Sequence, residues 1–148
     1  MIGKVIVEGL GLGLLLVLVC AVGISRGAVA LGLTTPERIR HNSIRFKLVC
    51  VPVYIAYVLV CVYAVNGARG FLTPFWQLLA ILSVMNLIDR FLVDDLWVGH
   101  TNAWTIPGTE DLKPYITAQN RKVKWLFGTV GMAVMAAVLS GVMLLFVR

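Results

Sequence analysis

The sequence predicts an all-helical membrane protein, a bundle of four helices that each cross a bilayer. Of its 148 residues, 59% are hydrophobic and only 14% carry a charge, and the mean hydropathy is +0.91. The apolar residues gather in four long stretches, and so few charges could not solvate the surface of a water-soluble domain. These observations exclude a disordered tail, a secreted disulfide scaffold and a soluble enzyme.

Each stretch supplies the roughly 20 apolar residues with which a helix crosses about 30 Å of hydrocarbon. All four contain glycine, proline or a polar residue, which helices tolerate in lipid where neighbouring helices pack closely. We expect one transmembrane domain over residues 1–148 of an inner-membrane protein, with structured loops on the cytoplasmic face. The expected spans are residues 5–24, 48–65, 71–88 and 123–147.

The basic residues predict the orientation of these helices. Five of the 13 lysines and arginines lie between the first and second spans and five from Arg90 to Lys124, at the start of the fourth span, so ten flank one side. Basic residues of membrane proteins accumulate in cytoplasmic loops. We therefore expect the first and third loops in the cytoplasm and both termini outside, and we assign the basic excess to topology rather than to nucleic-acid binding.

The connections between the spans have recognisable signals. Asn66 to Gly70 is typical of a tight turn, which would join the second and third spans in an antiparallel hairpin. The sequence Thr35-Pro36-Glu37 predicts the start of a basic surface helix, with Thr35 as its cap and Pro36 at its first position. If the third helix continues to about Val98, Arg90 and Asp94 stand four residues apart and can pair along it.

Five of the seven acidic residues lie between Asn86 and Tyr115, just beyond the third span. An ionisable side chain such as Asp89 at the lipid boundary is costly unless it faces the bundle or a partner. Two interpretations remain open: a structural salt bridge to an arginine of the first loop, or a site for an anionic lipid headgroup or small ligand.

In the second interpretation the residues divide into three roles. Arginines of the first loop neutralise the anion, two carboxylates orient it, and one histidine transfers a proton if the protein is an enzyme, with two tryptophans at the ligand. The same tryptophans are also typical of anchors at the membrane interface. The candidates are Arg38, Arg40, Arg45, Asp89, Asp95, His100, Trp97 and Trp104.

No metal or cofactor is predicted. Asp94 and Asp95 are adjacent and diverge on a helix, and no two acids stand four residues apart. The nucleotide-binding, nucleophile-elbow and zinc-protease motifs are absent from the sequence, and the three cysteines lie singly in apolar runs.

Two further interpretations concern Glu8 and assembly. Glu8 opens the first span, and it is either paired at the interface with Arg69 or Arg148 or is the proton-coupled group of a small transporter. Small residues on the first and fourth spans permit close helix contact, within one bundle or in a homo-oligomer. A non-enzymatic accessory or assembly subunit is the third alternative. The small residues are Gly9, Gly13, Ala133, Ala137 and Gly141.

Overall fold

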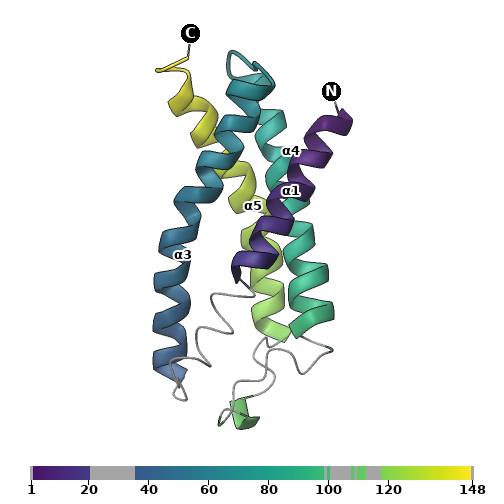
Figure 1. Ribbon diagram of the computed structural model, residues 1–148, viewed down its shortest axis with the longest axis vertical. Coiled ribbons are helices and arrows are strands. Elements are labelled where there is room, and N and C mark those ends of the chain that lie inside the picture. The colour runs from purple at the N-terminus through teal and green to yellow at the C-terminus, as the bar shows by residue number, and fades with distance from the viewer. Residues whose placement is uncertain are drawn as a thin grey trace.

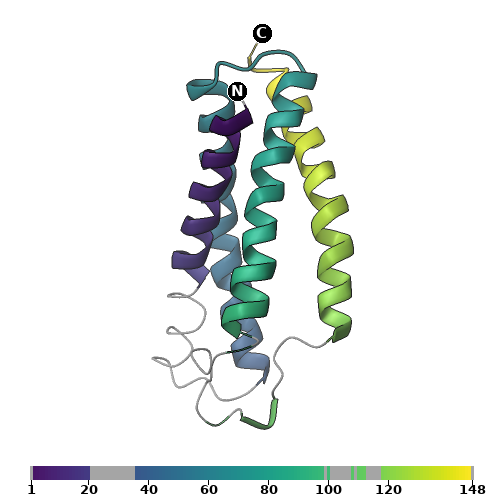
Figure 2. The ribbon, with the colours of Figure 1, turned by 90° about the vertical axis from the view of Figure 1, so that its right-hand side faces the viewer.

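The computed structural model describes residues 2–20, 36–98, 100, 108, 110–112 and 118–147. Every regular element in these ranges is helical, and four helices are long and apolar enough to cross a membrane, as predicted. They run side by side, and the start of the first and the end of the last lie at the same end of the bundle (Figures 1 and 2). These helices are α1 (Ile2–Cys20), α3 (Pro36–Leu59), α4 (Leu72–Ile88) and α5 (Ala118–Met143).

The helices of the hairpin are longer than the spans predicted from hydropathy. Helix α3 begins at Pro36, where the sequence predicts a helix start, because proline has a helical φ and lacks only an N–H that a first turn does not use. It continues as wider π-helical turns, η2 (Val60–Val65). Helix α4 continues in the same way through η3 (Asp89–Val98), so the expected extension to Val98 is confirmed.

The turn between these helices is also as predicted. Gly67 has a φ of 63° and Gly70 a φ of 75°, conformations that favour glycine. The Asn66 N–H donates to the carbonyl of Cys61 at 2.9 Å, and the Ala68 N–H donates to the carbonyl of Val62 at 3.0 Å. These bonds satisfy the last carbonyls of η2 and allow α4 to return beside it.

Helix α4 is the centre of the bundle. It packs along α1 and α5 and also contacts α3. Within its apolar window 39% of residues are buried, against 11% for α5, so α5 is attached along one face only. Leu12 of α1 and Leu78 and Ile81 of α4 are fully buried and form the middle of the shared core.

Glycine allows α1 to approach α4 closely. A Cβ atom added at Gly9 would lie 2.7 Å from the Cβ of Val84, and one at Gly13 would lie 2.2 Å from the side chain of Ile88. The small residues of α1 are therefore used within one bundle. Gly141 on α5 has nothing within 4 Å of its Cβ position, so it stays open in a single chain.

We expect Gly9→Ala to destabilise the protein by about 1–3 kcal/mol, because the new methyl group overlaps a branched side chain in a packed interface. Gly3→Ala is the matched control on the same helix, since nothing lies within 4 Å of its Cβ position. Thermal unfolding in detergent, followed by circular dichroism, measures both. Equal midpoints for the two variants would contradict the close α1–α4 contact.

Candidate functional site

Polar side chains gather at both ends of the bundle. We call the end where α1 begins the termini end, and the end where α3 and α5 begin the basic end (Figure 1). Helix α4 runs from the first to the second and contributes Gln77 near one, and its continuation η3 contributes Arg90 and three acids near the other. Glu8 and Asp95 are thus at opposite ends and do not share a site, as expected from the sequence.

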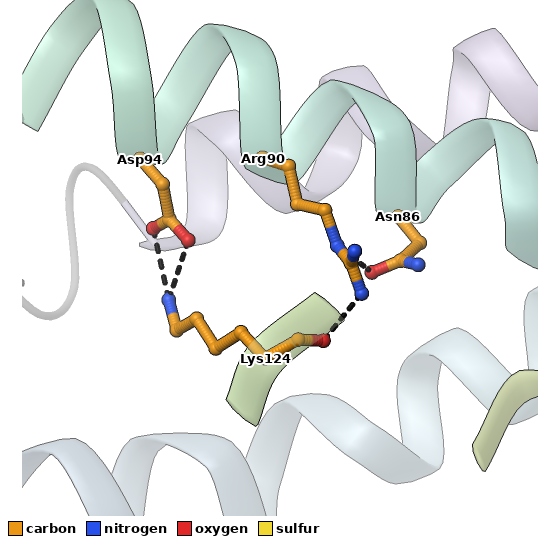
Figure 3. Close-up of polar contacts among 4 residues, drawn as sticks. All are labelled: Asn86, Arg90, Asp94 and Lys124. Atoms are coloured by element: carbon orange, nitrogen blue, oxygen red, sulfur yellow. Dashed lines mark hydrogen bonds and ion pairs between the residues drawn. The ribbon is translucent and has the colours of Figure 1, made fainter. Parts of the chain in front are cut away.

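At the basic end, α4, η3 and α5 are joined by a network of four side chains (Figure 3). Arg90 Nε donates to Asn86 Oδ1 at 3.1 Å, and its Nη2 donates to the backbone carbonyls of Lys124 and, at 3.2 Å, of Trp125. Lys124 Nζ binds both carboxylate oxygens of Asp94, at 2.7 and 2.9 Å. Arg90 and Asp94 are both buried, so the network closes this end of the α4–α5 interface.

The predicted pair between Arg90 and Asp94 is wrong. The Arg90 side chain leans back toward Asn86, as long side chains on helices do, while Asp94 meets Lys124 across the interface (Figure 3). The carbonyls of α5 offer Arg90 a better site than an acid one turn further along. Its guanidinium also lies 4.2 Å from the centre of the Trp125 ring, a cation–π contact.

Gly128 is the residue that admits Arg90 to this position. A Cβ atom there would lie 1.8 Å from Arg90 Nη2 and 2.8 Å from Asn86 Oδ1. Sequence reasoning missed Gly128, Lys124 and Asn86. The available signal is the spacing of Asn86, Arg90 and Asp94, three polar residues four apart at the end of an apolar helix.

Asp89 does not form the salt bridge that the sequence suggested as one of two interpretations. It forms no hydrogen bond or ion pair with any residue that the structure describes, although it interacts electrostatically with Lys47 of α3 and with Arg90 and Lys124. The charges of Arg90 and Lys124 are thereby balanced by those of Asp94 and Asp89. The expected bridge from Asp89 to an arginine near the start of α3 is not formed by Arg38, Arg40 or Arg45.

The other candidates of the third loop are only partly brought together. Asp95 lies 3.5 Å from Arg121, and the Nδ1 atom of His100 lies 2.7 Å from the backbone oxygen of Asp95. His100 therefore meets a helix carbonyl through Nδ1, a structural contact. Trp97 is half-buried at the end of η3, and Trp104 lies outside the described residues.

A large apolar groove separates α3 from α5. Its volume is about 760 Å³, and it is lined by one face of α5 from Leu126 to Leu139 and, on the α3 side, by Ile55. The groove follows from the packing of α5 mainly on α4 and its continuation η3, which leaves much of the α3-facing side of α5 uncovered. We call it the α3–α5 groove, and its lining residues include Ile55, Leu126, Val130, Gly131, Val134 and Leu139.

The helices that form the groove both begin with basic residues. The first three turns of α3 contain four basic residues and one acid, and the start of α5 contains three basic residues and no acid. Lys124 and Arg121 are paired with acids of η3. Five cations have no hydrogen bond or ion pair with a described residue: Arg38, Arg40, Arg45, Lys47 and Lys122.

At the termini end, Glu8 is buried inside the bundle rather than at the interface. Its predicted partner Arg69 instead donates to the carbonyls of Tyr63 and Ala68, while Arg148 lies outside the described residues. Asn66 Nδ2 donates to Glu8 Oε2 at 2.9 Å. The predicted pairing with Arg69 is therefore wrong, because the turn that follows η2 brings an amide to the carboxylate and directs the arginine to backbone oxygens.

The described residues hold no group of three His, Cys, Asp or Glu side chains that could bind a metal ion. Comparison of the chain with family models, with curated proteins and with solved structures finds no match. The function must therefore be inferred from the chemistry of the two ends and of the groove.

We expect Gly128→Ala to destabilise the protein by about 1–3 kcal/mol, because the added methyl group displaces the Arg90 guanidinium from the α5 carbonyls and leaves a buried charge with fewer partners. Gly131→Ala is the control, since it lies one turn further along α5 with nothing within 4 Å. Unfolding of both variants in mixed micelles tests this, and a Gly128→Ala protein as stable as the control would refute the role assigned to Arg90.

Proposed function

We propose that this protein binds an anionic membrane lipid, with its acyl chain in the α3–α5 groove and its headgroup at the basic end. The observation that carries the proposal is the combination of an apolar groove with several cations at one end of it that form no ion pair with a described residue. In this proposal the chain spans an inner membrane and the basic end faces the cytoplasm, in accordance with the distribution of lysine and arginine.

The groove has dimensions that suit an acyl chain. Its α5 wall extends from Leu126 to Leu139, which corresponds to about 20 Å at the rise of an α-helix. This is about two thirds of the thickness of the hydrocarbon core. The lining offers almost no polar surface, so a hydrocarbon chain can replace the lipid that otherwise solvates it, and no hydrogen bond is left unmade.

The charge at the basic end selects the headgroup. Lys124 is paired with Asp94, and Arg90 lies near Asp89, so the cations that remain for a ligand are those outside this group. Lys122 precedes the groove residue Leu126 by one helical turn, and Lys47 precedes Ile55 by about two. Both therefore lie on the approach to the groove from the basic end, where a phosphate or carboxylate group would neutralise them.

Asp89 and the third-loop residues have supporting roles in this proposal. Asp89 has no hydrogen-bond donor among the described residues, so it is available to accept a bond from a headgroup hydroxyl. Arg38, Arg40 and Arg45 add positive charge at the start of α3. Asp95, Trp97 and Trp104 complete the predicted headgroup site, and His100 would transfer a proton if a bound headgroup reacts.

We expect Gly131→Phe to remove most of the lipid that remains with the purified protein, because the ring fills the groove without displacing a neighbour. Gly141→Phe is the matched control, since it is on the same helix, is also open at its Cβ position and does not line the groove. Native mass spectrometry of gently extracted protein measures the retained lipid. Equal adducts in both variants would refute binding in the groove.

We expect Lys47→Ser to weaken binding of an anionic lipid about fivefold, the equivalent of the roughly 1 kcal/mol that one cation contributes near an anionic membrane surface. Titration with phosphatidylglycerol and with phosphatidylcholine, read by the same mass spectra, measures the effect. Lys4→Ser, which removes one charge at the termini end, is the control. A stoichiometric protein partner in place of lipid would favour the accessory-subunit alternative.

A further inference from the structure

Glu8 is one of three buried or partly buried polar side chains that form a cluster at the termini end, remote from the proposed lipid site. Only 8% of its surface is exposed, and Gln77 of α4 is 6% exposed. Asn66 joins them, since its Nδ2 donates to Glu8 Oε2 at 2.9 Å and to Gln77 Oε1 at 3.1 Å. The Tyr57 hydroxyl donates to the backbone oxygen of Glu8 at 3.2 Å rather than to its carboxylate.

The donors and acceptors of this cluster do not balance. Its three side chains present oxygen atoms from one carboxylate and two amides, and a single amide group supplies both hydrogen bonds between them. Glu8 Oε1 and Asn66 Oδ1 are buried and have no hydrogen-bond partner in the part of the chain that the structure describes. A buried carboxylate oxygen without a donor is costly, so a positive group is missing from the cluster.

The charged and titratable groups around Glu8 do not supply it. On its own helix, Lys4 lies one turn away but its Nζ donates to the carbonyl of Val65 at 3.2 Å. On α3 and η2, Tyr57 and Cys61 interact with Glu8 electrostatically and bring no positive charge. From α4 the neighbour is Gln77, which is not titratable.

We propose that Glu8, Asn66 and Gln77 form a binding site for a monovalent cation, a proton or a sodium ion. A proton on Glu8 gives the carboxyl group the hydrogen that Oε1 lacks and removes a negative charge from the apolar bundle. A sodium ion would be held by the same oxygen atoms, which are the hard ligands that such a cation prefers. The site is independent of the lipid groove.

An apolar cavity gives access to this cluster. It has a volume of about 290 Å³ and lies between α1 and α4, and Gln77 is one of its few polar lining residues. A small apolar reagent that enters the cavity from the hydrocarbon side therefore reaches the cluster at Gln77. Dicyclohexylcarbodiimide is such a reagent, and it adds to a protonated carboxyl group to give a stable N-acylurea.

The test is carbodiimide labelling of the whole protein in liposomes, in sodium-free buffer at neutral pH, with peptide mass spectrometry. We expect the label on Glu8 and not on Glu37, which is exposed to water rather than to the hydrocarbon from which the reagent enters. Loss of the label on adding sodium chloride, but not choline chloride of equal concentration, identifies sodium as the ligand. Labelling that sodium does not change identifies the proton.

A second measurement does not depend on access of the reagent. The infrared difference spectrum between the native protein and Glu8→Gln should contain the carbonyl stretch of a protonated carboxylic acid in sodium-free buffer, and sodium should remove this band if it binds. Glu37→Gln is the matched control and should leave both label and band in place. Absence of both the Glu8 label and the acid band would overturn the proposal.

Discussion

The structure depends on the rule that a polar side chain inside an apolar bundle must find its partner in the protein. Helix α4 and its continuation η3 have polar side chains at both ends to which this rule applies. Arg90 meets it at Nε and Nη2, with the side chain of Asn86, two carbonyls of α5 and the Trp125 ring, while its buried Nη1 has no partner among the described residues. This contact attaches α5 to the rest of the bundle. Gly128 is small for the same reason, since any side chain there would occupy the place of the guanidinium.

The α3–α5 groove is a consequence of this attachment. Helix α5 is fixed to α4 by the polar network at one end and by buried contacts such as Ala136 further along, while α3 has no comparable polar contact with α5. Hydrophobic attraction between helices is weak in lipid, because the alternative neighbour is equally apolar. Two helices without a specific contact therefore have no reason to close the space between them.

Hydropathy was sufficient to predict the four long apolar helices, because a span must be long and apolar whatever it packs against. The turn at Asn66 to Gly70 and the helix start at Pro36 were predictable from local backbone preferences. The side-chain partner of each polar residue could not be predicted from the sequence. Lys124 is 30 residues from Asp94 in the sequence, and only the packing of α4 against α5 shows that Lys124, rather than Arg90, pairs with it. Glu8 was misplaced for the same reason, since its partner Asn66 is 58 residues away.

The two polar ends differ in one respect that separates a structural role from a binding role. At the basic end the charges of Arg90, Lys124, Asp94 and Asp89 cancel within the protein, and the surplus cations stand outside this network. At the termini end the bundle interior lacks hydrogen-bond donors, because Glu8 Oε1 and Asn66 Oδ1 are buried and no described residue donates to them. A surplus of positive charge on the surface attracts a large anion from the membrane. A lack of hydrogen-bond donors in the interior, by contrast, accepts only a small cation. The same rule of polar satisfaction thus leads to ligands of opposite charge at the two ends of α4.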